Sequence, residues 1–244
     1  MKIYPRFTSL ALCGLSSLSL AQTDNHTHTE LRADDHAPIG IMADHYHEAG
    51  EIMFSYRYMS MSMKGNADGR SDLSEATIAT TMPNRFFGMP MQPPTLRVVP
   101  TEMTMDMQML GIMWAPNDRI TLMGMLNHIN KEMDHITFQG PAGTNVLGGF
   151  TTRSSGLGDT SVAALVRLRE SENARLHLTA GLSIPTGATD ETGTVLAPTG
   201  MRPTLRLPYP MQLGSGTYDL VGGLTYSRFS EQSSWGTQWR STVR

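Results

Sequence analysis

Hydrophobic and polar residues alternate with a period of two along much of the chain after Gly50. The alternation is clearest over 102–109, where four methionines occupy the odd positions and polar residues occupy the even ones. A helix would scatter these methionines around its surface, because successive helical residues are about 100° apart. A strand places all of them on one face, so the pattern predicts a β-strand.

The same alternation predicts six further strands, over 51–64, 120–127, 161–169, 175–184, 218–227 and 233–243. The connections are alternately long (65–100, 138–156 and 187–214) and tight (115–118, 170–173 and 230–232). A soluble β-sandwich also alternates its faces, but it has no reason to lengthen every second connection. Long loops alternating with short turns are typical of outer-membrane proteins. The chain is therefore predicted to be all-β, an antiparallel transmembrane β-barrel of the outer-membrane type.

The first 48 residues have a different character from the strands. Lys2 and Arg6 precede a stretch rich in Leu, Ala and Ser, which ends at the small-residue site Ser19-Leu20-Ala21. This layout predicts a secretory signal peptide over 1–21. Residues 22–48 are polar and rich in histidine and are predicted to form a periplasmic arm, with the barrel domain over 49–244. We expect the exported protein to reside in the outer membrane of a Gram-negative bacterium.

Composition narrows the class of protein further. The 244 residues carry a net charge of −3 and contain no basic run, so nucleic acid is not an expected partner. With 39% hydrophobic and 17% charged residues, the chain is too polar for a bundle of membrane helices. The one cysteine, Cys13, would be removed with the signal peptide, which excludes disulfides and thiol catalysis in the exported protein.

In a barrel, one face of every strand contacts lipid and the other lines the lumen. The methionines of 102–109 are interpreted as facing lipid, because the opposite positions are polar. The polar positions of this strand and of two later ones are then predicted to line the lumen and to select the diffusing small molecule. These residues are Glu102, Asp106, Gln108, Arg167, Arg169, Arg175 and His177.

A second set of residues suggests metal chemistry, with copper as the candidate ion. Imidazole suits copper or zinc, and thioether sulfur is soft enough for Cu(I). The candidate ligands are His26, His28, His36, His45, His47, Met59, Met61 and Met63. A strand would space the three methionine sulfurs by about 6.6 to 6.8 Å on one face. The alternative interpretation is a solvated tail and ordinary apolar packing by methionine, which is an adaptable side chain.

Three glycine-containing motifs carry a resemblance to a known family. They are Gly156-Leu157-Gly158-Asp159, then Gly181 to Gly187 (GLSIPTG), then Gly214 to Asp219 (GSGTYD). In this order they resemble the outer-membrane family named for the meta-pathway of phenol degradation, many of whose members are called transporters. Asp35 to Gly40 and Ser55 to Met59 resemble a branch of that family rich in methionine and histidine. The resemblance implies a barrel that passes hydrophobic or aromatic compounds, and it brings no catalytic residues.

The sequence contains none of the common catalytic signatures, such as Gly-x-Ser-x-Gly, His-Glu-x-x-His or a phosphate-binding glycine loop. We therefore expect a protein that is not an enzyme. Three functions are consistent with the residues. The first is a channel for small, hydrophobic or aromatic solutes. The second is a copper-linked protein that uses the arm and the methionine-rich strands, and the third is a structural outer-membrane protein without transport.

Seven strands are an odd number, whereas bacterial single-chain barrels have an even number. An open barrel would also leave two unpaired edges in lipid, where each unsatisfied backbone group costs several kcal/mol. We therefore expect either an unrecognised strand within 65–100 or 187–214, or at least one strand beyond Arg244.

Overall fold

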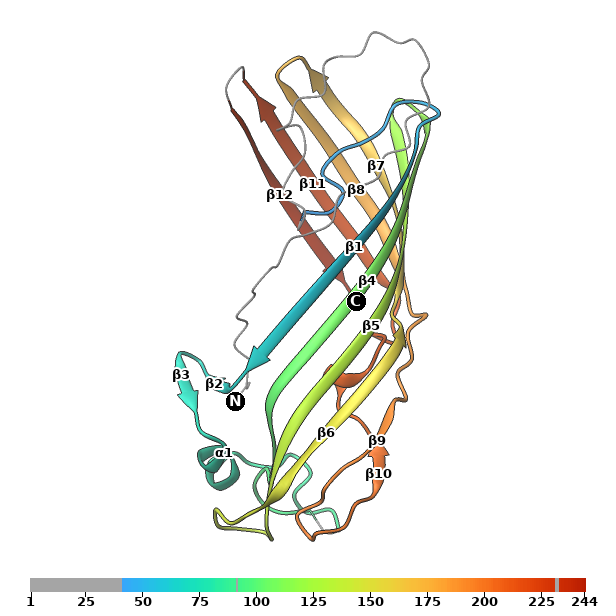
Figure 1. Ribbon diagram of the computed structural model, residues 1–244. Helices are drawn as coiled ribbons and strands as arrows, with labels where there is room; N and C mark the ends of the chain where they lie inside the picture. Colours follow the sequence, from blue (N-terminus) through green and yellow to red (C-terminus); the bar gives the residue numbers. More distant parts are fainter. Residues whose placement is uncertain (1–40, 91, 231–232) are drawn as a thin grey trace.

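The computed structural model describes residues 41–90, 92–230 and 233–244, and antiparallel strands dominate it (Figure 1). The main sheet has the order β1-β4-β5-β7-β8-β11-β12, with β6 also paired to β5. Its strands are β1 (Ile52–Lys64), β4 (Val98–Asn117), β5 (Ile120–Phe138), β6 (Val146–Leu157), β7 (Thr160–Ser171), β8 (Ala174–Ile184), β11 (Asp219–Phe229) and β12 (Ser234–Val243). The sheet curls into a half-barrel, which confirms the predicted antiparallel all-β fold.

β1 and β12 are the two edges of this sheet. Within the part of the chain that the structure describes, they are not paired with each other. The described residues therefore form an open curled sheet. None of the described helices is long and apolar enough to cross a membrane.

All seven predicted strands are present, but the prediction of a long loop over 138–156 is wrong. Most of it is β6, which pairs with the second half of β5, while β7 pairs with the first half. β6 and β7 together therefore run along the whole of β5, interrupted only at Gly158 and Asp159. The alternation that marks a strand is missing from β6, because its sequence, VLGGFTTRSSGL, is mostly small and polar on both faces.

The other two long connections contain only short elements. Between β1 and β4 lie β2 (Asn66–Asp68), β3 (Ser71–Leu73) and α1 (Glu75–Thr81), and the side chain of Ser74 caps α1 by accepting from the Thr77 amide at 3.1 Å. Between β8 and β11 lie β9 (Thr192–Thr194), β10 (Thr204–Arg206) and the 3-10 turn η1 (Tyr209–Met211). β2 pairs with β3 and β9 with β10, so no described strand of these connections joins the main sheet.

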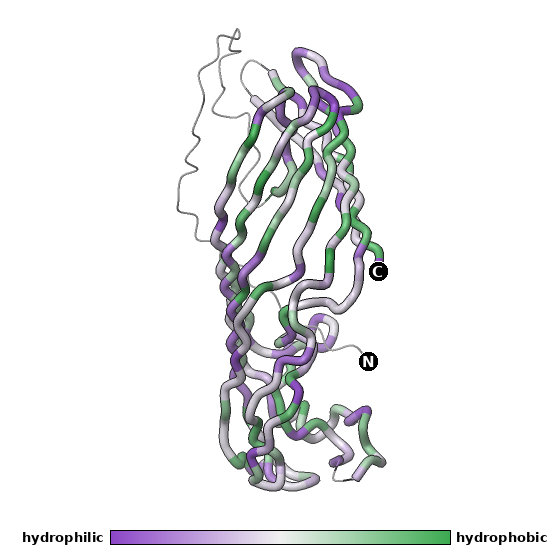
Figure 2. Tube along the Cα trace, turned by 90° about the vertical axis from the view of Figure 1, so that its right-hand side faces the viewer, coloured by the Kyte–Doolittle hydropathy of each residue, from purple (hydrophilic) through white to green (hydrophobic). Residues whose placement is uncertain are grey.

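One face of the main sheet is apolar and exposed near the tight turns. Phe54 of β1 is 72% exposed and Trp239 of β12 is 64% exposed, although both are large and hydrophobic. Figure 2 shows hydrophobic residues recurring along the strands of this part of the sheet. We call these residues the outer band, and they include Phe54, Tyr56, Leu110, Ile112, Trp114, Leu122, Leu126, Val162, Leu178, Leu220, Leu224, Trp235 and Trp239.

Toward the long loops, the same face of β4 to β6 becomes polar. Glu132 of β5 forms a salt bridge with Arg153 of β6 at 2.8 Å, and Asp134 accepts a hydrogen bond from Thr151 at 2.5 Å. The 20 residues of β4 span roughly 65 Å. A lipid-facing apolar band is about 25 Å tall. The longest strands therefore extend well beyond any such band.

A single buried arginine organises the end of the molecule that carries α1. Arg97 is only 2% exposed, and its guanidinium donates to the carbonyl oxygen of Ala79 at the end of α1. It also donates to the loop after β5, at the carbonyls of Gln139, Gly140, Ala142 and Gly143. Burial lowers the pKa of this guanidinium, but the group remains charged because a guanidinium does not lose its proton in proteins.

Replacing Arg97 by methionine should loosen α1 and the loop after β5 together. The substitution leaves five carbonyl oxygens without their donor, and we expect a local loss of at least about 2 kcal/mol. Proteinase K cleavage within 65–97 should then become at least about tenfold faster. Arg85→Met is the matched control, because Arg85 is exposed and its guanidinium lies 5.3 Å from the Phe86 ring. Equal cleavage rates in the two variants would contradict this role of Arg97.

Candidate functional site

The concave face of the sheet lies opposite the outer band and is the candidate site. Near the tight turns it is covered by residues 41–50, which we call the inner segment, and Ala43 of this segment packs against Met113 and Met123. Near the long loops it is covered by the connection between β8 and β11, whose Leu207 and Met211 pack against Met103. The concave face is therefore filled from both ends.

The methionines of 103–109 lie on this concave face, so the prediction that they face lipid is wrong. Residues directly paired across antiparallel strands share a face. Met61 pairs with Met105 and Met59 with Met107, whereas the exposed Tyr56 pairs with Leu110. The alternation in one strand shows two faces but does not show which one points inward. The pairing with β1, whose aromatic residues face outward, decides it.

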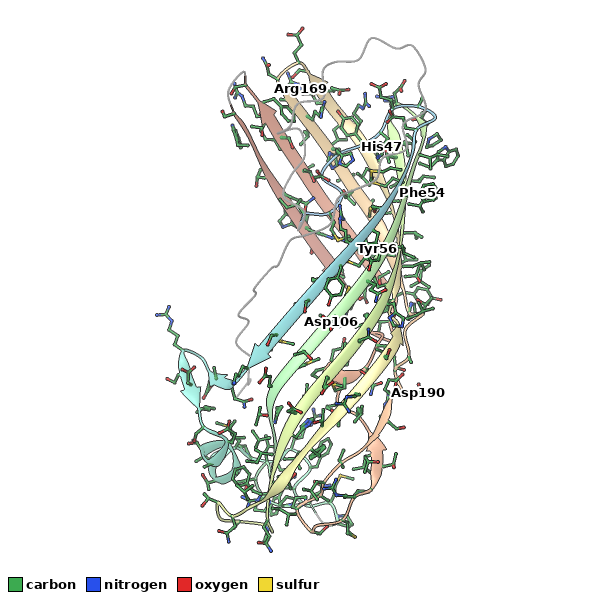
Figure 3. All side chains as sticks on the ribbon, in the orientation of Figure 1. His47, Phe54, Tyr56, Asp106, Arg169 and Asp190 are labelled. Carbon is green, nitrogen blue, oxygen red and sulfur yellow. The ribbon has the colours of Figure 1, made fainter. Side chains whose placement is uncertain are left out.

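The prediction that Glu102, Asp106 and Gln108 line the lumen is wrong for the same reason. They lie on the outward face of β4, where the Tyr58 hydroxyl donates to Asp106 at 2.7 Å (Figure 3). Their polarity is explained by their position, since this part of β4 extends past the outer band. Glu102 lies 3.6 Å from the ammonium group of Lys64, across the same outward face.

The four other predicted lumen residues are divided between the two faces. Arg167, Arg175 and His177 lie on the concave face, where Arg167 pairs with His177. Glu170 contacts both arginines, at 2.5 Å from Arg167 and 3.7 Å from Arg175. Arg169 follows a register shift after Arg167, and it lies exposed beside the β7–β8 turn (Figure 3). Simple alternation would place Arg169 on the concave face with Arg167. The register shift places it on the outward face instead.

The inner segment is tied to strands from both sides of the curled sheet. The His177 ring of β8 donates from Nε2 to the Ala43 carbonyl at 2.9 Å. The Gln238 amide of β12 donates to the Met42 carbonyl at 3.0 Å. On the other side, the His47 amide donates to Thr121 of β5 at 2.9 Å. These contacts hold the segment across the hollow of the sheet.

Two features show that the inner segment is closely fitted. Ala43 is buried with a φ of 58°, a left-handed conformation that non-glycine residues rarely adopt. The guanidinium of Arg167 lies 4.1 Å from the centre of the Tyr46 ring, and that ring meets His177 edge-on at 5.7 Å. Sequence reasoning did not single out Tyr46, Thr121 or Gln238, because each acts through a partner that is distant along the chain.

The structure brings together only part of the predicted copper ligand set. His26, His28 and His36 lie outside the described residues. The rings of His45 and His47 are 5.0 Å apart, and they contact the carboxylates of Asp44 and Glu51 respectively. Met59, Met61 and Met63 face inward farther along β1. Within the described ranges, no group of three or more His, Cys, Asp or Glu residues is arranged to hold a metal ion.

The three glycine-containing motifs meet around one carboxylate. Asp159 accepts from the Gly187 amide at 3.0 Å and from the Ser215 amide at 2.7 Å, so one residue from each of the three motifs takes part. The Thr186 hydroxyl also donates to the Gly158 carbonyl at 2.9 Å. This motif junction fixes the start of β7, the end of β8 and the approach to β11. It lies at the end of these strands that is opposite the tight turns.

The motif junction explains two of the glycines. A Cβ atom on Gly187 would lie 2.6 Å from the Gly214 Cα atom, and one on Gly214 would overlap the Gly187 carbonyl oxygen. Real Cβ atoms essentially never approach so closely. Glycine is therefore required at both positions by backbone contact.

The chain matches a known protein family. The family model described as "Putative MetA-pathway of phenol degradation" matches residues 117–243, which is more than half of the chain and includes all three motifs of the junction. No curated protein and no solved structure matches the chain.

Asp159→Asn should destabilise the motif junction, because the asparagine side chain has one oxygen acceptor and its NH₂ group would oppose a backbone N–H. Loss of one buried acceptor costs about 1–3 kcal/mol. The change is measured as the free energy of unfolding in urea, with the protein in detergent micelles. Asp190→Asn is the control, since Asp190 is exposed in the same connection (Figure 3). An Asp159→Asn variant as stable as the control would show that the junction is dispensable.

Proposed function

Because this chain belongs to the family named for the MetA pathway of phenol degradation, we propose that it is an outer-membrane protein that passes small hydrophobic or aromatic solutes. The fold and the family are consistent with a protein of the Gram-negative outer membrane. The family description names a degradative pathway and no catalytic activity. We propose a transport role and no enzymatic one.

The observation that carries this proposal is the outer band. Soluble monomers rarely expose contiguous apolar surface larger than a few hundred Å². The exposed large apolar residues come from every strand of the main sheet. In β1, β4 and β5 they lie in the half nearer the tight turns, and in β6 they lie only at its two ends, at Val146, Leu147 and Leu157. Aromatic residues such as Tyr58, Tyr218 and Trp235 are among them. An apolar band with aromatic residues is what a lipid-facing strand surface requires.

The loops support an orientation for the proposed membrane protein. The tight turns 118–119 and 172–173 lie at one end of the sheet, and the connections 65–97 and 185–218 lie at the other. In bacterial barrels the short turns are periplasmic and the long loops are extracellular. The polar extension of β4 to β6 would then project outward from the cell.

The proposed solute class rests on the family and on the apolar nature of much of the concave face. The inner segment fills that face near the tight turns, so passage of a solute requires the segment to move. We propose that residues 41–50 act as a plug held by His177 and Arg167. The closely filled concave face equally favours a second candidate function, a structural outer-membrane protein without transport, and conductance distinguishes the two.

A charge within the outer band should destabilise the protein in lipid. Ile112→Lys places an ammonium group on the outward face of β4, and we expect a loss on the order of 2–4 kcal/mol if this position lies near the bilayer midplane. Gln108→Lys is the matched control, because Gln108 lies four residues from Ile112 on the same outward face, where the strand is polar. Unfolding in urea from lipid vesicles, followed by tryptophan fluorescence, measures the difference. Similar losses in both variants would argue against a lipid-facing band.

Releasing the plug should raise conductance. His177→Leu removes the ring N–H that binds the Ala43 carbonyl, while the size of the side chain is roughly kept. In planar lipid bilayers we expect the wild type to conduct weakly and His177→Leu to open more often or to a larger conductance. His128→Leu on the outward face of β5 should leave conductance unchanged. Absence of conductance in all three proteins would favour the structural role.

A further inference from the structure

The methionines of the main sheet are segregated to one face. Twelve of the 19 methionines lie in β1, β4 and β5, and all twelve lie on the concave face. They are Met53, Met59, Met61, Met63, Met103, Met105, Met107, Met109, Met113, Met123, Met125 and Met133. The outward face of the same strands uses Ile, Leu, Phe, Tyr and Trp as its large apolar residues. If methionine served only as an apolar filler, it would be expected on both faces.

The register places three of these methionines side by side. Met113 pairs with Met53 of β1 and with Met123 of β5, which makes one row across three adjacent strands. Neighbouring strands are about 4.8 Å apart, so the three Cα atoms span roughly 10 Å. Their side chains stand on the concave face, and its curvature brings them toward one another. We call these three residues the methionine row.

A small cavity adjoins the methionine row. Its volume is about 20 Å³, and its walls include Met42, Met109, Met125 and the imidazole of His45. About 10–15 Å³ is enough for one water molecule. The cavity therefore has room for a single ion, and it is too small for an aromatic solute. Asp44 and Arg57 also border it, so charges of both signs lie at its wall.

The chemistry of these walls selects a particular kind of ion. Thioether sulfur is a soft, neutral ligand, and soft sulfur ligands prefer Cu(I) to Mg²⁺, Ca²⁺ or Mn²⁺. Met113 is 6% exposed and Met123 is 8% exposed, so their sulfur atoms are withdrawn from solvent. We propose that this cavity binds one Cu(I) ion through the thioethers of Met53, Met113 and Met123. Because Met42 and His45 of the inner segment form part of its wall, the cavity requires that segment to be in place.

A second row on the same strands provides a matched comparison. Met63, Met103 and Met133 are paired in the same way across β1, β4 and β5. There the neighbouring space is occupied by Leu207 and by Met211, which is 0% exposed. This second row also contains three thioether sulfur atoms, but apolar side chains fill the space beside it. Cu(I) binding is therefore assigned to the methionine row.

The test uses the mature protein in detergent, titrated anaerobically with Cu(I) against a chromogenic Cu(I) chelator. One variant carries Met53→Leu, Met113→Leu and Met123→Leu, and the control carries Met63→Leu, Met103→Leu and Met133→Leu. Leucine keeps nearly the same volume and removes the sulfur, and each exchange usually costs less than about 1.5 kcal/mol. Far-UV circular dichroism and heat-modifiable gel mobility check that both variants are folded.

We expect the wild type and the control to bind one Cu(I) ion tightly, and the methionine-row variant to bind at least about 100-fold more weakly. X-ray absorption of the wild-type complex should show sulfur neighbours around copper. The proposal is overturned if the wild type binds no Cu(I) at micromolar concentration, or if both triple variants bind equally well or equally poorly. Because the titration needs no membrane, its failure leaves the conductance experiment unaffected.

Discussion

The cross-strand register of β1, β4 and β5 is the constraint on which the rest of the structure depends. Met113 pairs with both Met53 and Met123, so the facing of one strand determines that of its neighbours. A shift of one residue would move every side chain of a strand to the opposite face. It would expose the methionines and bury Phe54 and Trp114. The outer band, the concave face and the methionine row are therefore consequences of a single register.

The hollow of the curled sheet is stabilised by contacts between segments that are far apart along the chain. The Ala43 carbonyl and His177 are separated by 134 positions, and the Met42 carbonyl and Gln238 by 196. These bonds connect the inner segment to β8 and β12, while Thr121 connects it to β5. Asp159 has an equivalent role at the opposite ends of β7 and β8. There it accepts hydrogen bonds from backbone amides of the two other motifs of the family. Both arrangements satisfy backbone groups that would otherwise be buried without partners.

Sequence periodicity was sufficient to predict the seven strands and the sheet's antiparallel class, because a two-residue period is a local property. It could not predict β6, whose small and polar residues show no period, since both of its faces lie away from the apolar band. It also assigned Glu102 and Asp106 to the wrong face, because a single strand's pattern does not tell inward from outward. The methionine row could not be predicted for the same reason, because the sequence alone does not show which residues of β4 and β1 lie beside Met123.

Arg97 has a consequence for how the α1 end of the molecule responds to its surroundings. Within the described part of the chain, its guanidinium is matched by carbonyl oxygens of the backbone, at 3.0 Å for Ala79 and 2.8 Å for Gly143. Carbonyl groups carry partial charges and do not titrate. Ion pairs between exposed side chains weaken as salt rises, and those that involve a carboxylate weaken in acid. A buried cation held by peptide dipoles is subject to neither effect, so the contacts of Arg97 at this end of the protein should persist when ionic strength and acidity change.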